Sequence, residues 1–159
     1  MCAARAYLDT CIVTGLAKGD LAPDSVAALL HILQARKTGS VELFTSKVAL
    51  EEISRIPLEH RTQHSIIYGL LADVPLANTH YKIPPFRPVQ IFRRNDPLLA
   101  SLERLLPDAA DAMHVFQASK ACLTHLITVD RRTLLNHKVS VFQLCSVHLV
   151  SPVEFVREL

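Results

Sequence analysis

The sequence predicts an α/β fold: a three-layer α/β/α sandwich with a central, mostly parallel sheet, formed by one domain over residues 1–159. Two observations predict it. Short apolar segments alternate with helical segments along the chain, which favours parallel strands joined by helical crossovers. Half of the residues are hydrophobic, which is enough for one substantial core in a chain of this length.

In the amino-terminal half, turn residues and prolines mark the limits of each element. The predicted elements are a strand at 6–8, helices at 10–17 and 23–38, a strand at 41–45, a helix after Ser46 that ends before Pro57, and a helix at about 60–71. Gly19 and Gly39 are natural stops after the first two helices, and Ser46 is placed to cap the third. This half therefore supplies two strands of the sheet.

Five of the nine prolines fall between residues 75 and 97, so a regular helix is excluded there and only a short strand at 89–92 is predicted. The carboxyl-terminal half then resumes the alternation. Its predicted elements are helices at 98–106 and 108–122, a strand at 125–129, a short helix through 135, a strand at 147–150 and a helix at 152–156.

The composition excludes several classes of function. The four cysteines lie far apart without a C-x-x-C pair, which argues against zinc or redox chemistry and fits a reducing compartment. No secretory signal or membrane-spanning apolar run is present, so we expect a cytoplasmic protein without a membrane partner. The formal charge of +2 neither requires nor opposes a nucleic-acid partner.

A basic strip lies in the proline-rich stretch. It consists of Lys82, Arg87, Arg93 and Arg94, with aromatic residues interleaved and no acid from residue 82 to 94. Such a strip is typical of a surface that binds RNA phosphates. A solvated loop whose charges only keep the crossing soluble is an equally good interpretation.

Acidic residues stand where elements of an α/β sheet meet. Asp9 and Asp130 each follow a predicted strand, and the carboxyl ends of parallel strands are where ligands bind. Glu52 and Asp111 lie on helices, and Glu52 is preferred to Glu51 because its helical neighbours are apolar. If these elements surround one sheet, the carboxylates converge, and a hard divalent cation would neutralise them.

Each acid also has an ordinary structural role open to it, and Glu51 and Glu52 could be ordinary exposed helix residues. Asp9 could cap the helix that follows it, and Asp130 could form a turn. Asp111 is stabilised by the helix dipole alone, although Asp108 suits the cap of that helix better.

The acidic positions occur within fragments that together resemble the PIN-domain family of metal-dependent ribonucleases, over nearly the full chain. The fragments are Leu8-Asp9-Thr10, Thr45-Ser46 followed by Glu51-Glu52-Ile53, Asp111-Ala112-Met113-His114, Ile127-Thr128-Val129-Asp130 and Leu149-Val150-Ser151-Pro152. Their order and spacing carry more weight than any one of them. The doubled glutamate and the long proline-rich stretch depart from the family pattern.

The resemblance implies a site and an activity. Asp9, Glu52, Asp111 and Asp130 would be the catalytic residues and would hold Mg²⁺ or Mn²⁺, with Glu51 as the alternative to Glu52. The polar neighbours would be Thr10, Ser46, His114 and Thr128, although for His114 we favour a partly buried ring with one hydrogen bond. The implied activity is hydrolysis of RNA by metal-activated water, in a single-domain form similar to toxins that pair with a small antitoxin and form homodimers.

Two other functions remain open. One is a non-catalytic RNA-binding or protein-interaction module that keeps the fold and uses the basic strip. The other is a phosphate-ester hydrolase or receiver-like domain with Asp9 as nucleophile or phosphoacceptor. The latter ranks lower because no accompanying lysine and threonine signature is found.

Overall fold

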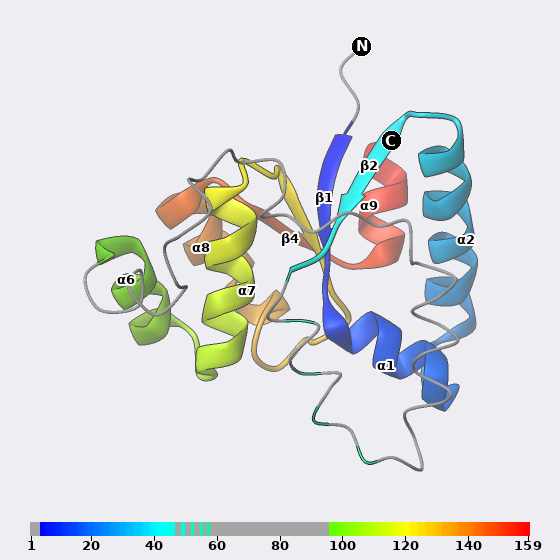
Figure 1. Ribbon diagram of the computed structural model, residues 1–159. Coiled ribbons are helices and arrows are strands. Elements are labelled where there is room, and N and C mark those ends of the chain that lie inside the picture. Colours follow the sequence, from blue (N-terminus) through cyan, green and yellow to red (C-terminus); the bar gives the residue numbers. More distant parts are fainter. Residues whose placement is uncertain (1–3, 47–48, 50–51, 53–54, 56, 58–95) are drawn as a thin grey trace.

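The computed structural model describes residues 4–46, 49, 52, 55, 57 and 96–159 (Figure 1). Within them the chain has an α/β fold around four strands, all paired in parallel in the order β2-β1-β3-β4. The strands are β1 (Ala4–Leu8), β2 (Val41–Phe44), β3 (His125–Ile127) and β4 (His148–Val150). The predicted alternation of strands with helices and the parallel pairing are therefore confirmed.

Several predictions fall outside these residues. They are the helix at about 60–71, the strand at 89–92, Glu51, and the basic strip of Lys82, Arg87, Arg93 and Arg94. Positions 49 and 52 are helical, in agreement with the helix predicted after Ser46.

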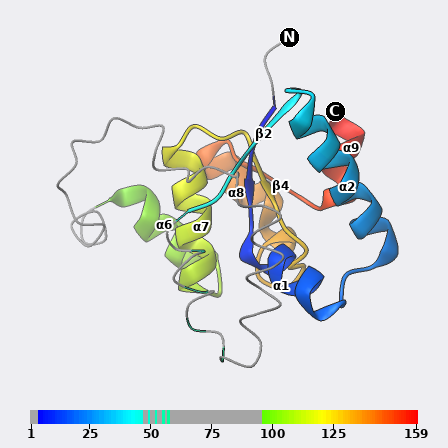
Figure 2. The ribbon, with the colours of Figure 1, turned by 45° about the vertical axis from the view of Figure 1, so that its right-hand side comes forward.

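Helices lie on both faces of the sheet (Figure 1, Figure 2). On one face α2 (Pro23–Lys37) packs against α9 (Pro152–Glu158). On the other lie α6 (Pro97–Leu105), α7 (Ala109–Lys120) and α8 (Lys138–Cys145). None of the helices formed by the described residues has the length and apolar character needed to cross a membrane.

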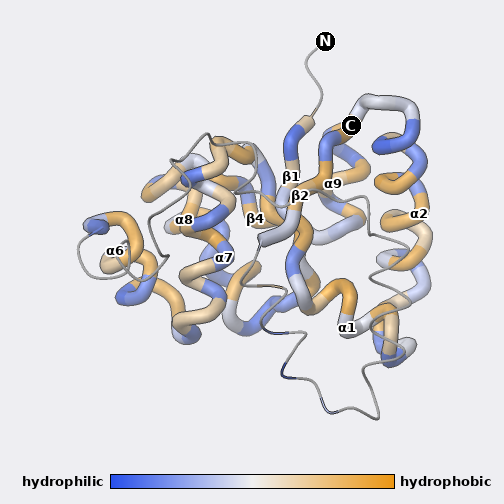
Figure 3. The backbone as a smooth tube through the Cα atoms, in the orientation of Figure 1, coloured by the Kyte–Doolittle hydropathy of each residue, from blue (hydrophilic) through white to orange (hydrophobic). Residues whose placement is uncertain are grey.

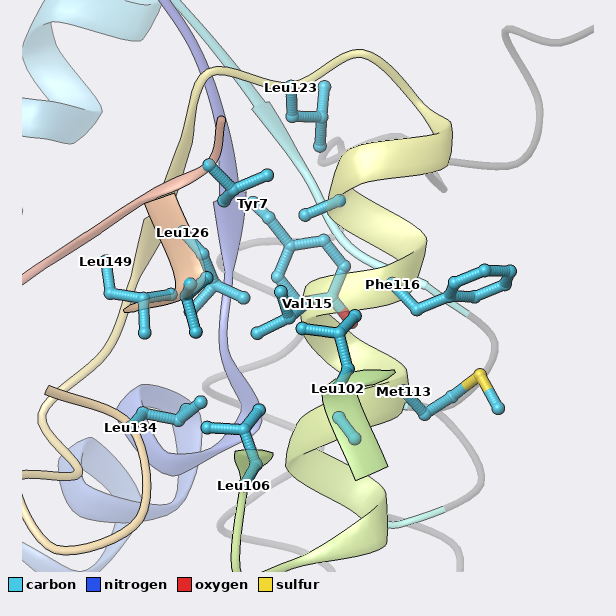
Figure 4. Close-up of a cluster of buried hydrophobic side chains, with 14 of the residues drawn as sticks. Tyr7, Leu102, Leu106, Met113, Val115, Phe116, Leu123, Leu126, Leu134 and Leu149 are labelled. Carbon is cyan, nitrogen blue, oxygen red and sulfur yellow. The ribbon is translucent and has the colours of Figure 1, made fainter. Parts of the chain in front are cut away.

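Strand side chains alternate between two hydrophobic cores because successive residues of a strand point to opposite faces. Ala6 and Leu8 of β1 pack in the core beneath α2 and α9, whereas Tyr7 packs in the core beneath α6 and α7. Figure 4 shows the Tyr7 ring between β1 and α7. The same alternation in β3 sends Leu126 and Ile127 to opposite cores.

The helix that continues from β1 is α1 (Thr10–Lys18), and Figure 3 shows it as largely hydrophobic. Ile12 and Val13 are buried in the core shared with α2, so α1 is held against the end of the sheet. It ends at Gly19, which has φ +71°, a conformation that glycine adopts without strain. The predicted stop at this glycine is confirmed.

The sequence does not predict α8, because only a short helix through 135 is expected there. The structure has a turn of 3-10 helix at Leu135–His137 and then α8. Val141 is buried, but Val139, Phe142 and Leu144 are exposed, so the apolar residues do not follow one face of the helix. Without that periodicity, the pattern that predicts a surface helix is missing.

Candidate active site

Asp9 is a buried carboxylate at the carboxyl end of β1. Only 4% of its surface is exposed, and its Oδ2 accepts hydrogen bonds from the Thr128 hydroxyl at 2.7 Å and the Cys11 thiol at 2.9 Å. Thr128 follows β3, so this contact ties together two adjacent strand ends. Asp9 occupies the N-cap position of α1, yet its side chain caps no backbone N–H. The ordinary capping role therefore does not explain this aspartate.

The Cys11 thiol acts as a hydrogen-bond donor to Asp9. Burial, followed by the charge of Asp9 and the hydrogen bond to it, raises the pKa of Cys11 far above its usual value. The sulfur also lies 3.2 Å from Thr128 Oγ1 and accepts a hydrogen bond from Val129 N at 3.4 Å. The thiol is thus kept protonated and helps to fix the Asp9 carboxylate.

Asp111 lies in the first turn of α7, beside the other aspartates. Asp108 caps this helix by accepting from Ala110 N at 2.7 Å, which confirms its predicted role and leaves Asp111 out of the cap. Burial raises the pKa of Asp111 to about 6, and the charges of Asp9, Asp108 and Asp130 raise it in the same direction. Asp9, Asp111 and Asp130 therefore interact through space.

Asp130 also forms the turn that follows β3. Its Oδ1 accepts from Thr133 N at 2.9 Å, and its own N–H donates to Thr128 Oγ1 at 3.1 Å. The turn-forming role considered for this residue is present. The hydrogen bond from Thr133 N engages one carboxylate oxygen of Asp130 and fixes the side chain beside the strand end.

Glu52 is the end of a chain of hydrogen bonds through the core. Its two carboxylate oxygens lie 3.0 and 3.1 Å from His114 Nε2, which carries the proton because a carboxylate only accepts. His114 Nδ1 lies 2.7 Å from the Tyr7 hydroxyl, which is 2.6 Å from Ser46 Oγ. The expectation of a partly buried histidine with one hydrogen bond is wrong: His114 is only 1% exposed and bonds at both nitrogens.

Within this series of hydrogen bonds, His114 and Glu52 each stabilise the charged form of the other. Burial alone would lower the pKa of His114, but the hydrogen bond that it donates to Glu52 and the charges of Asp9, Glu52 and Asp111 outweigh this effect and raise the pKa. Burial would raise the pKa of Glu52, but the hydrogen bond and charge of His114 outweigh it and lower the pKa. Glu52 is therefore held ionised, and His114 is biased toward its charged form.

Two buried hydroxyls beside these carboxylates lack hydrogen-bond partners among the described residues, those of Thr10 and Thr133. Thr10 helps to lower the pKa of Glu52, and Thr133 opposes the raised pKa of Asp111. Each hydroxyl is thus near a carboxylate without reaching hydrogen-bond geometry. Unpaired buried polar groups are uncommon, and a bound ion or water is one of their ordinary explanations.

Comparisons with family models, with curated proteins and with solved structures found no match. The assignment of a function therefore depends on the chemistry of the site.

We call Asp9, Glu52, Asp111 and Asp130 the acidic site. All four contribute to one local field, because Asp9, Glu52 and Asp111 act on His114 while Asp9 and Asp130 act on Asp111. Within the described ranges, however, no three histidine, cysteine or acidic side chains are close enough together to hold a metal ion. The carboxylates are neighbours and do not form a closed cage.

Three residues with contacts at this site were not singled out from the sequence: Tyr7, Cys11 and Thr133. Tyr7 joins Ser46 to His114, and Cys11 joins Asp9 to Thr128. These links join residues between 2 and 117 positions apart, so local patterns do not reveal most of them. The one available signal is Tyr7, a residue with a hydroxyl in an otherwise apolar strand.

Proposed function

We propose that this protein is a ribonuclease dependent on Mg²⁺ or Mn²⁺, similar to PIN-domain enzymes, that hydrolyses RNA phosphodiester bonds. One observation carries the proposal. Carboxylates from separate parts of the chain lie near one another at the carboxyl ends of parallel strands: burial raises the pKa of Asp111 to about 6, and the charges of Asp9 and Asp130 add to the increase. Such a field is unfavourable in the free protein and is relieved by a cation.

The chemistry of the donors fits a hard divalent cation. Carboxylate oxygens dominate the acidic site, and the unpartnered hydroxyls of Thr10 and Thr133 are further oxygen atoms beside it. Mg²⁺ usually keeps several waters and is bound through one or two carboxylates, so a closed cage of three side chains is not required. Asp9, Asp111 and Asp130 would hold the ion directly or through water.

The remaining contacts assign roles to the protein's own groups. Glu52 is ionised and partly exposed, with a side-chain exposure of 27%, so it can accept a proton from water and orient that water for attack. His114 holds the Glu52 carboxylate in place, and Tyr7 holds His114. A bound ion lowers the pKa of water and offsets charge on the phosphoryl oxygens. No side chain needs to act as a nucleophile.

A second candidate is a non-catalytic RNA-binding or protein-interaction module. It is favoured by the finding that three metal-ligating side chains do not come together within the described residues. It is also favoured by Asp9, whose Oδ2 already has two hydrogen-bond donors within the protein. This module would bind RNA without divalent ions and would be insensitive to changes at Asp9 or Asp130.

Calorimetric titration with Mn²⁺ distinguishes the two functions. The wild type should bind Mn²⁺ stoichiometrically and cleave a single-stranded RNA, whereas Asp9→Asn and Asp130→Asn should lose both properties while circular dichroism reports a folded protein. Glu158→Gln is the matched control, because it removes an acid far from the acidic site. Folded Asp9→Asn and Asp130→Asn proteins that retain full metal-dependent cleavage would exclude the assignment.

A further inference from the structure

A pocket of about 470 Å³ lies along α1 and reaches the acidic site. Thr10, Thr14 and Lys18 line it, and they are spaced four residues apart, so they form one stripe on the helix. Glu52 also lines the pocket, so the pocket and the acidic site share a wall. We call this cavity the α1 pocket.

Three polar side chains of α1 along the α1 pocket, those of Thr10, Thr14 and Lys18, have no hydrogen-bond partner among the described residues. Thr10 is only 9% exposed, and its buried hydroxyl has no hydrogen-bond partner among the described residues. Among the residues that the structure describes, the Thr14 hydroxyl and the Lys18 ammonium form no hydrogen bond or ion pair. The stripe therefore offers the Thr14 hydroxyl and the Lys18 ammonium to a ligand, with the buried Thr10 hydroxyl at its end beside the acidic site.

The chemical nature of these groups indicates which ligand would bind. Lys18 and Thr14 together suit a phosphate, since an ammonium supplies charge and a hydroxyl donates a hydrogen bond. Asp20, which also lines the pocket, is an acceptor for sugar hydroxyls or base amino groups. The volume lies in the range that accommodates a small organic ligand.

The length of the stripe fits more than one phosphate. Thr10 and Lys18 are eight residues apart, which corresponds to about 12 Å along a helix. A ligand in contact with Lys18 and with the edge of the acidic site must therefore be extended, as a polynucleotide chain is. A single phosphate ion would contact only one end.

We propose that the α1 pocket holds a nucleotide of single-stranded RNA next to the cleaved phosphodiester, with its phosphate on Lys18 and Thr14. This inference rests on the proposed ribonuclease function, because it identifies the direction in which the RNA extends from the acidic site. Lys18 is then a substrate-binding residue, and α1 supplies both the first catalytic carboxylate at its start and a phosphate contact at its end.

The test measures RNA binding in EDTA, where a metal-dependent enzyme cannot cleave. A fluorescein-labelled single-stranded RNA of twelve nucleotides is titrated with the wild type and with Lys18→Gln, Thr14→Val and Lys37→Gln, and fluorescence anisotropy gives Kd at several salt concentrations. Lys37→Gln is the matched control, because this exposed lysine is also in the last turn of its helix but does not line the pocket. Circular dichroism confirms the fold of each variant.

Lys18→Gln should raise Kd about fivefold or more at low salt and reduce the slope of log K against log salt concentration by about 0.7, the value for one phosphate contact on a single strand. Thr14→Val should raise Kd about twofold to threefold. Lys37→Gln should match the wild type. If Lys18→Gln has the affinity and slope of Lys37→Gln, or if the wild type does not bind the RNA, the inference is overturned.

Competition then separates a nucleotide from a phosphate ion. Adenosine 5′-monophosphate should displace the labelled RNA at lower concentration than inorganic phosphate does, and Lys18→Gln should weaken its competition. Equal competition by the two would overturn the assignment of a nucleotide. The failure of the proposed function has a different signature: RNA binding that depends on Lys18, with neither Mn²⁺ binding nor cleavage, would retain the α1 pocket and reject the ribonuclease.

Discussion

The two ends of the sheet differ in how their charged side chains are arranged. At the amino ends of the strands, each of two acidic side chains lies beside a basic one: Arg5 pairs with Glu42 at 3.3 Å, and His125 hydrogen-bonds to Glu158 at 2.9 Å. At the carboxyl ends, like charges gather, and the pKa of Asp111 is raised by burial and further by the charges of Asp9 and Asp130. Paired charges are explained by stability alone, whereas a concentration of like charges calls for a function.

The largest effect expected from this contrast is the loss of activity in Asp9→Asn. Cleavage should fall at least about 100-fold, since a metal ligand is removed. Stability should change by no more than about 1 kcal/mol, because asparagine keeps an oxygen that can accept from Thr128 and Cys11. Single-turnover cleavage assays and urea denaturation measure the two quantities. A large loss of stability with intact cleavage would show that Asp9 serves stability and not activity, as the paired charges at the other end do.

Tyr7→Phe should have the largest effect on stability. It removes a hydroxyl from the buried chain and leaves His114 Nδ1 and Ser46 Oγ without that partner, which costs about 1–3 kcal/mol. Urea denaturation gives the free energy of unfolding. Thr124→Val is the comparison at the amino end: its exposed hydroxyl bonds Arg5 O and His125, and the change should cost no more than about 0.5 kcal/mol. Equal costs would mean that the Tyr7 hydroxyl is not part of a rigid network.

Glu158→Gln should cost only about 0.2–1 kcal/mol, because the Glu158 carboxylate is exposed and its partner His125 carries a charge only when protonated. Thermal unfolding at low and high salt, in a buffer acidic enough to protonate His125, measures this change, and the difference from the wild type should shrink as salt screens the pair. If the loss of stability in Glu158→Gln does not depend on salt, the packing of α9, and not the contact of Glu158 with His125, accounts for it.

The smallest effect is a pH dependence of opposite sign for two histidines. Burial lowers the pKa of His125, so its contribution to stability is present above pH about 6.5 and is lost as the pH falls. The pKa of His114 is raised, so its contribution is present below pH about 6.5 and is lost as the pH rises through the pKa of the folded state. Ring NMR titration in EDTA should find His114 titrating above His125. The reverse order would contradict the charge distribution described for the two ends.

The sequence predicts those parts of the fold that local physics determines. The strand end before Asp9, the turn at Asp130, the stop at Gly19 and the cap by Asp108 all follow from residues within a few positions, although β3 ends at Ile127, two residues earlier than predicted. The contacts of Cys11 with Thr128 and of Tyr7 with His114 do not, because they join positions more than 100 residues apart. The missed helix α8 has a third cause, since its apolar residues are mostly exposed. Sequence patterns report which residues are near an element's end, but not which buried polar groups meet there.

The course of α9 has a practical consequence for measurements at surfaces. The helix starts with a capping box between Ser151 and Glu154 beside the carboxyl end of β4, and it finishes where Glu158 meets His125 at the amino end of β3. A tether joined at Leu159 would therefore leave from the end of the sheet that lies away from Asp9. A protein immobilised through such a tether would present its carboxylates and the α1 pocket to the solution.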